Sequence, residues 1–182
     1  MEKLEKERKF LVKLSRSWAS LSDMFDNLIG IKRITQTYLV SFGGEPATRV
    51  RKTVSGLIGN PRAVYHFNQK ELVAPGVHKE KEKKISRYEY EQYLTKFDKN
   101  KIPIAKTRFI FKYCDQVFEL DIFKGLLKGL AVLEIELKDM NYGVKPPPFL
   151  HVIKEVTGDK QFSNFNLANK DLSEELLDIL DI

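Results

Sequence analysis

Charged side chains of like sign recur two residues apart along this sequence. The pairs are Glu5/Glu7, Glu89/Glu91, Glu134/Glu136, Arg49/Arg51 and Lys106/Arg108. Residues two apart on a strand point to the same face, so the members of each pair repel each other there. A divalent cation relieves this repulsion between carboxylates, and a polyanion relieves it between basic groups. The spacing therefore indicates a site that binds a metal ion together with a polyanion.

Short segments in which apolar and polar residues alternate carry most of these pairs. Turn residues separate the segments, and this pattern is typical of an antiparallel β protein. We expect eight strands, at about residues 4–12, 33–41, 47–54, 63–71, 85–91, 105–113, 116–123 and 130–138. Three ranges have helical features: 17–28, 148–156 and 172–180. The alternating lysines and glutamates of residues 79–84 are expected to form a solvated, mobile loop.

The charged face of the strands can be placed in two ways. In the first, it is the solvated face of an ordinary half-buried sheet, and the apolar face fills the interior. In the second, eight strands close into a barrel without exposed edges, and the charged face lines a wet tunnel. We favour the second arrangement, because paired like charges are unusual on a solvated face. The expected fold class is α+β: a closed eight-stranded antiparallel β-barrel with helices packed outside.

Composition limits the partners and the compartment. The net charge is +6 and the pI is about 9.2, which favours anionic partners. Cys114 is the only cysteine in the sequence, so no internal disulfide is expected. No apolar segment follows Met1, and no apolar run approaches the ~18 residues of a membrane span. We expect one domain over residues 1–182, located in the cytoplasm and away from membranes.

An ordered set of motifs resembles the CYTH superfamily, the triphosphate tunnel metalloenzymes, and in particular its short single-domain bacterial members. The motifs are Glu5-x-Glu7-x-Lys9, Arg49-x-Arg51, Lys70, Arg87-x-Glu89-x-Glu91, Lys106-x-Arg108, Glu119-x-Asp121, Glu134-x-Glu136 and a tail that contains Lys160. Together they extend over residues 5–169. The tail departs from related short members, which often have basic residues where this chain has Gln161, Ser163 and Asn164.

The resemblance implies roles for these residues. Phosphate oxygens would be gripped by Lys9, Arg49, Arg51, Lys70, Arg87, Lys106, Arg108 and Lys160. Glu5, Glu7, Asp121, Glu134 and Glu136 look like metal ligands, and oxygen ligands of this kind suit Mg²⁺ or Mn²⁺. The group at the reaction centre would be Glu5, Glu7, Lys9 and Lys70, with Glu89, Glu91 and Glu119 on a further part of the tunnel wall.

Three functions are compatible with this resemblance. The one we favour is metal-dependent hydrolysis of a triphosphate, with inorganic tripolyphosphate giving pyrophosphate and phosphate. The second is an adenylate cyclase of the class IV type, which releases pyrophosphate from ATP. The third is a non-catalytic triphosphate-binding module. The cations are paired with nearby acids in strands, which argues against nucleic acid as a partner, except for an RNA 5′-triphosphate end. A homodimer is compatible with the sequence.

Overall fold

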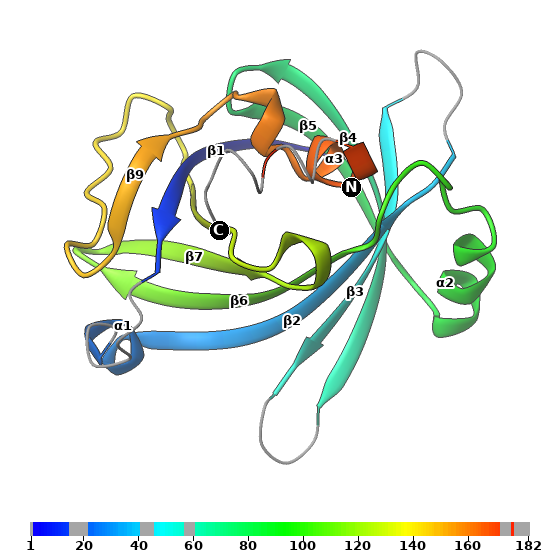
Figure 1. Cartoon of the computed structure of the whole chain (residues 1–182), viewed down its shortest axis with the longest axis horizontal. Coiled ribbons are helices and arrows are strands. Elements are labelled where there is room, and N and C mark those ends of the chain that lie inside the picture. The colour runs from blue at the N-terminus through cyan, green and yellow to red at the C-terminus, as the bar shows by residue number, and fades with distance from the viewer. Residues whose placement is uncertain (1, 15–21, 41–45, 57–60, 172–175, 177–182) are drawn as a thin grey trace.

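One antiparallel sheet closes on itself in the computed structural model, which describes residues 2–14, 22–40, 46–56, 61–171 and 176 (Figure 1). Its strands are β1 (Glu2–Lys13), β2 (Leu28–Tyr38), β3 (Ala47–Ser55), β4 (Arg62–Ala74), β5 (Val77–Ile85), β6 (Ile104–Tyr113), β7 (Gln116–Phe123), β8 (Ala131–Glu136) and β9 (His151–Glu155). The order is β5-β4-β3-β2-β6-β7-β8-β1, and β1 also pairs with β5. The expected closed eight-stranded barrel is therefore confirmed, and β9 adds to the far end of β1.

Alternation along the strands separates a charged inner face from an apolar outer face. On β1, Glu5, Glu7 and Lys9 line the barrel interior, whereas Phe10 and Val12 belong to an apolar cluster outside. The inward placement of the charges is therefore confirmed. The outer cluster is covered by Met24 of the helix α1 (Ser22–Asp26) and by apolar residues of the segment 137–150. The cover is thus only partly helical.

The charged layer gives way to an apolar layer on the same inner face. Two residues beyond Lys9 on β1 lies Leu11, and two beyond Asp121 on β7 lies Phe123. Both side chains are buried in one apolar cluster with Val132, Ile104, Phe162, Leu167 and other residues. Because residues two apart share a face, this cluster bounds the charged space along the barrel axis.

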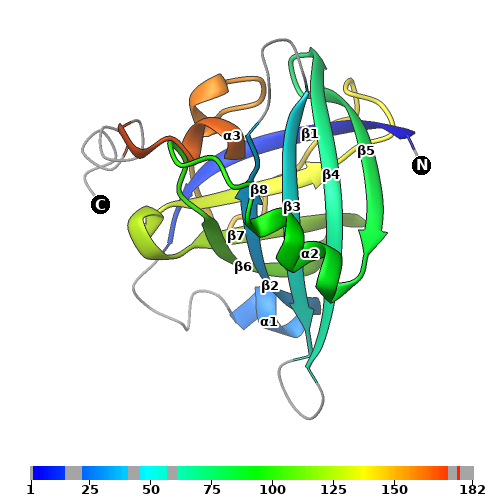
Figure 2. The same cartoon turned by 90° about the vertical axis from the view of Figure 1, so that its right-hand side faces the viewer.

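The strand expected over residues 85–91 is wrong. Ile85 ends β5, and α2 (Arg87–Leu94) follows it on the outside of β3 and β4 (Figure 2). Ser86 and Glu89 form a capping box, which starts the helix by satisfying free backbone N–H groups. Tyr90 and Tyr93 then pack on Tyr65 and Phe67 of β4, with ring centroids 4.8 and 4.9 Å apart. The helical spacing (i, i+3) of Tyr90 and Tyr93 and the capping box therefore favour a helix, although apolar and polar residues alternate along this segment.

The mobile loop expected over residues 79–84 is also wrong, because these residues belong to β5. Antiparallel pairing with β4 on one side and β1 on the other satisfies the backbone of this strand. Glu80 and Glu82 are half-buried, whereas Lys79, Lys81 and Lys83 are exposed. The alternation of sign in the sequence is thus a strand pattern with acids inside and lysines outside.

Two of the expected helices differ from the structure. Residues 148–156 contain the strand β9, which pairs with β1. Of residues 17–28, only α1 is helical in the described part, and β2 begins already at Leu28. Most of the third range, 172–180, lies outside the described residues; Leu176 within it is buried. Among the described residues, no helix has the length and apolar character needed to cross a bilayer.

Candidate functional site

A charged lumen lies inside the barrel beside a larger pocket. The free volume of the lumen is only about 60 Å³, because ion pairs between strands fill it. Its charged lining consists of Glu5, Glu7, Lys9, Arg49, Arg51, Lys70, Glu80, Lys106, Arg108, Glu119, Glu134 and Glu136. Glu7, Lys9, Arg49 and Lys70 also line the neighbouring pocket of about 280 Å³. The two spaces therefore adjoin.

Lys9 lies between two carboxylates at the junction of β1 and β8. Its Nζ is 2.8 Å from Glu134 Oε1 and 3.3 Å from Glu7 Oε1. This proximity follows from strand register, which places Lys9 opposite Glu134 and Glu7 opposite Glu136. Burial alone would raise the pKa of Glu134, but Lys9, Lys106 and Arg108 outweigh it and hold that pKa well below its usual range. Glu134 is therefore ionised at neutral pH.

Arg108 on β6 binds three carboxylates at once. Its Nε and Nη2 donate to Asp121 Oδ1 and Oδ2 over 2.7 and 2.6 Å, and Nη2 also donates to Glu134 Oε2 over 2.6 Å. Its Nη1 contacts Glu119. Lys106 binds the same Asp121, whose side chain is fully buried. This arrangement joins two cations and three acids in one network on the tunnel wall.

A second pair of basic residues, Arg49 and Arg51 of β3, is held by residues of β4 and β5. Arg49 Nη2 is 3.2 Å from Glu80 Oε1, and Arg51 Nη2 is 2.6 Å from Glu82 Oε2. The buried amide of Asn68 donates to both glutamates, over 3.1 and 2.6 Å. Sequence reasoning missed Glu80 and Glu82, because residues 79–84 were assigned to a loop. It also missed Asn68, which lies within the expected strand over residues 63–71 but carries no charge. The period-two alternation of lysine and glutamate was the signal that could have found the glutamates.

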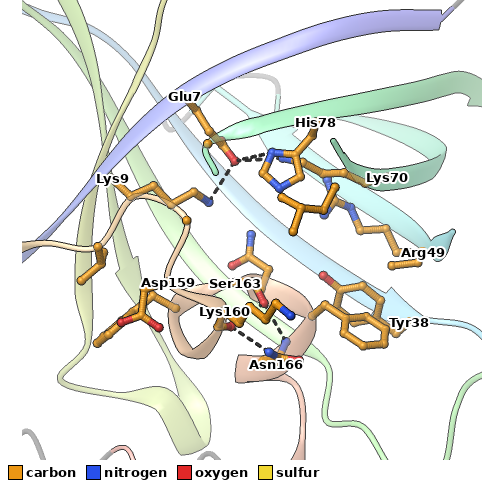
Figure 3. A pocket seen from close by; sticks show the side chains of 18 residues that line it. Glu7, Lys9, Tyr38, Arg49, Lys70, His78, Asp159, Lys160, Ser163 and Asn166 are labelled. Carbon is orange, nitrogen blue, oxygen red and sulfur yellow. Dashed lines mark hydrogen bonds and ion pairs between the residues drawn. The ribbon is translucent and has the colours of Figure 1, made fainter. Parts of the chain in front are cut away.

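Lys70 and His78 surround Glu7 from the β4–β5 side (Figure 3). Lys70 Nζ is 2.6 Å from Glu5 Oε2 and 3.0 Å from Glu7 Oε1, and His78 Nδ1 is 3.5 Å from Glu7 Oε1. Burial, followed by the charge of Lys70, lowers the pKa of His78 to about 4, so its imidazole is neutral at neutral pH. His78 is a further lumen residue that sequence reasoning missed.

The turn between β4 and β5 fixes the position of Glu7. Gly76 has a φ of +71°, and its carbonyl oxygen accepts a hydrogen bond from the Glu7 N–H over 2.8 Å. A Cβ on Gly76 would lie 2.7 Å from Glu7 O, so glycine is required both for the backbone conformation and for the close approach.

The larger pocket lies beside this turn and is bounded by the C-terminal segment. Two short helices, η3 (Lys160–Phe162) and α3 (Asn164–Leu167), form one wall. Lys160, Ser163 and Asn166 from these helices and Tyr38 from β2 line it (Figure 3). Lys160 therefore lines the larger pocket that adjoins the lumen.

Most of the residues singled out in the sequence meet in this lumen. Lys160 lines the adjoining pocket instead, and Asp121 is buried behind Lys106 and Arg108. Arg87, Glu89 and Glu91 lie on α2 outside the barrel. Arg87 and Glu91 pair with each other over 2.7 Å, with side chains 76% and 52% exposed. Placing them on the tunnel wall is therefore wrong. Glu136 stands near the rim, where it binds Lys3.

The carboxylates of the lumen fit a divalent cation. In the described part of the chain, ligand atoms of Glu5, Glu7 and His78 lie within 4.8 Å of one another. Carboxylate oxygens are the ligands that Mg²⁺ and Mn²⁺ prefer. His78 Nδ1 is buried without a hydrogen-bond partner among the described residues, and Glu5 Oε2 is buried beside the ammonium group of Lys70. The two carboxylates and their convergence thus match a divalent cation.

Known proteins resemble this chain in sequence and in structure. An alignment of 92 positions that covers 46% of the chain shows 37% identity to an inorganic triphosphatase of Acetivibrio thermocellus. An alignment of 68 positions that covers 36% of the chain shows 41% identity to an inorganic triphosphatase of Nitrosomonas europaea. These matches span 58% and 44%, or about half, of the two curated relatives.

The crystal structure of the inorganic triphosphatase NE1496 matches over 90% of this chain and 93% of that chain, with a TM-score of 0.58 and 28% identity. The model of the CYTH domain matches residues 3–142, which is well over half of the sequence. This range contains the closed barrel and every charged residue of the lumen named above. The chain therefore belongs to the CYTH domain family.

Proposed function

We propose that this chain is a metal-dependent triphosphatase that hydrolyses inorganic tripolyphosphate to pyrophosphate and phosphate. One observation carries the proposal. Lys9, Arg49, Arg51, Lys70, Lys106 and Arg108 all line one narrow lumen, and each is within ion-pair distance of a carboxylate there. The names of the two curated relatives and of the similar crystal structure support the same activity.

The lumen matches the charge of a linear triphosphate. Tripolyphosphate carries several negative charges, which need several cations in a row to be neutralised. Arg49 and Arg51 on β3 face Lys106 and Arg108 on β6 across β2, which pairs with both strands. On binding, phosphate oxygens would replace carboxylates as partners of these cations. The released carboxylates would then be free to hold metal.

Glu5, Glu7, Glu134 and Glu136 would hold the metal, because they come from the neighbouring strands β1 and β8 and include the two directly opposed residues Glu7 and Glu136. Asp121 would join them only by exchanging its contacts with Lys106 and Arg108. When bound, Mg²⁺ or Mn²⁺ would neutralise phosphate charge and lower the pKa of a coordinated water. Glu119 would keep its role of orienting Arg108.

The reaction consumes one water per triphosphate. The water oxygen forms a bond to the terminal phosphorus, and the bond from that phosphorus to the bridging oxygen breaks. Pyrophosphate leaves on the opposite side, and a proton is released to solvent. Lys70 and Lys9 stand at the junction of lumen and pocket, where they would neutralise the terminal phosphate or the leaving group.

Product analysis tests this function. The purified chain is incubated with tripolyphosphate, ATP, GTP or thiamine triphosphate, each with Mg²⁺ or Mn²⁺, and the products are separated by chromatography. Orthophosphate release that is fastest from tripolyphosphate and lost on chelation is expected. A cyclic nucleotide with pyrophosphate would replace the proposal with a cyclase, and tight binding without products would replace it with a binding module.

A further inference from the structure

His78 occupies a defined place in the β1–β5 ladder. It is the direct cross-strand partner of Glu5, and the inward side chain of Glu7 follows two residues later on β1. This register brings ligand atoms of the three side chains within 4.8 Å of one another, among the residues that the structure describes. The imidazole is therefore held against two carboxylates by backbone pairing and not by a flexible loop.

One of the converging atoms has unused capacity. Within the described residues, His78 Nδ1 is buried without a hydrogen-bond partner, whereas Glu5 Oε2 is paired with the ammonium group of Lys70. Nδ1 lies 3.5 Å from Glu7 Oε1. Adjacent ligands of an octahedral ion are separated by ~3 Å and opposite ones by ~4 Å, since metal–ligand bonds are ~2.1 Å. The three donors can thus share one ion after small side-chain movements.

The ammonium group of Lys70 already binds these carboxylates in the structure. Lys70 Nζ lies 2.6 Å from Glu5 Oε2 and 3.0 Å from Glu7 Oε1. The position between Glu5 and Glu7 is therefore one that attracts positive charge. Lys70 also lines the larger pocket, toward which its ammonium group can turn to meet a phosphate.

We propose that His78 supplies a nitrogen ligand to a metal position shared with Glu5 and Glu7, and that this ligand makes the chain prefer Mn²⁺ to Mg²⁺. Mg²⁺ binds oxygen ligands almost exclusively, whereas imidazole nitrogen suits the transition metals. The inference rests on the proposed function only in placing a divalent cation in the lumen. It adds a residue and a metal preference that the carboxylates alone do not imply.

The second histidine of the tunnel wall provides a matched control. His66 on β4 also faces a glutamate, with Nε2 3.6 Å from Glu82 Oε1. Glu82 is already held by Arg51 and Asn68. Among the described residues, the group of ligand atoms within 4.8 Å of one another includes His78 and not His66. His66, like His78, is a histidine beside a glutamate, but it lacks the ligand geometry predicted for His78.

Electron spin-echo spectroscopy of Mn²⁺ tests the proposal directly, because it detects a ¹⁴N nucleus bonded to the ion. The chelator-treated wild-type chain, His78→Gln and His66→Gln are each loaded with one equivalent of Mn²⁺. Modulation from ¹⁴N is expected in the wild type and in His66→Gln and should be absent in His78→Gln. Circular dichroism and thermal melting establish that both variants are folded.

Competition between the ions gives a second readout. The amide oxygen of Gln can still serve Mg²⁺, so His78→Gln should lose about tenfold in Mn²⁺ affinity while Mg²⁺ affinity changes little. Mn²⁺ bound tightly to the wild type without ¹⁴N modulation would overturn the proposal, as would modulation that survives in His78→Gln. Failure of the wild type to bind Mn²⁺ would overturn it too.

These readouts are independent of catalysis. Modulation that depends on His78 in a chain that releases no phosphate would leave the metal ligand in place and reject the triphosphatase. Phosphate release from a chain without such modulation would reject the nitrogen ligand alone.

Discussion

Asp121 on β7 binds Arg108 on the neighbouring strand β6 through two parallel hydrogen bonds of 2.7 and 2.6 Å inside the barrel. Lys106 binds the same carboxylate, so one buried acid is the shared partner of two buried cations. We expect Asp121→Asn to lower the free energy of unfolding by about 3 kcal/mol, because the change leaves buried positive charge uncompensated. Chemical denaturation of the metal-free chain measures this loss.

Asp115→Asn is the control for that change. Asp115 sits in the exposed turn between β6 and β7 and pairs there with Lys112. Asparagine tolerates its positive φ of 61°, so stability should stay nearly constant. If both variants lose equal stability, the buried carboxylate has no special role.

Glu134→Gln and Arg49→Ala should affect different kinetic constants. Glu134 contacts both Lys9 and Arg108 at the centre of the lumen, so losing its charge should reduce kcat by about 100-fold or more through the metal site. Arg49→Ala should mainly raise KM, by about tenfold, since it removes one phosphate contact. Steady-state kinetics with tripolyphosphate separates the two effects. Full activity of Glu134→Gln at saturating metal would contradict its assignment as a ligand.

Acid should weaken the ion pair between Arg51 of β3 and Glu82 of β5. Burial tends to raise the pKa of Glu82, but Arg51 and the Asn68 hydrogen bond outweigh it and lower that pKa below its ordinary value of 4.5. As the pH falls, the folded chain then binds fewer protons than the unfolded chain. The contribution of Glu82 to the free energy of unfolding is therefore complete above about pH 4.5 and is lost below it. Wild type should exceed Glu82→Gln in melting temperature at about pH 7, and the difference should shrink below about pH 4.5.

Lys83→Gln is the control for the acid effect, because Lys83 lies on the exposed face of the same strand. Its melting temperature should follow that of the wild type throughout. A difference between wild type and Glu82→Gln that grows on acidification would show that the Arg51–Glu82 pair does not stabilise the fold.

The barrel was predictable because its charged residues obey a simple alternation. Glu5, Glu7 and Lys9 share one face of β1 with Leu11, and the partner strands repeat the pattern, so the inner face could be identified from the sequence. Closure followed from the number of strands. Seven of the eight expected strands occur near their expected positions.

The missing strand shows where alternation fails as a guide. Residues 79–84 and residues 85–91 both alternate, and the sequence alone gives no backbone pairing to choose between them. Charge made the first range resemble a loop, although a charged strand is stable when its acids meet Arg49 and Arg51 inside the barrel. His78 was not assigned to the site because the histidines of the sequence have neither zinc-ligand spacing nor a cysteine cluster. These contacts depend on register between distant strands, which no local pattern encodes.

Two changes at the start of α2 test its placement outside the barrel. Ser86 caps the helix by accepting from the Glu89 N–H, so Ser86→Ala should cost about 1 kcal/mol of stability without changing kcat or KM. Arg87→Ala removes only an exposed pair with Glu91 and should change neither stability nor kinetics. Denaturation and tripolyphosphate kinetics on both variants provide the measurement. A large rise in KM for Arg87→Ala would mean that Arg87 reaches the substrate, which its position on the outer helix forbids.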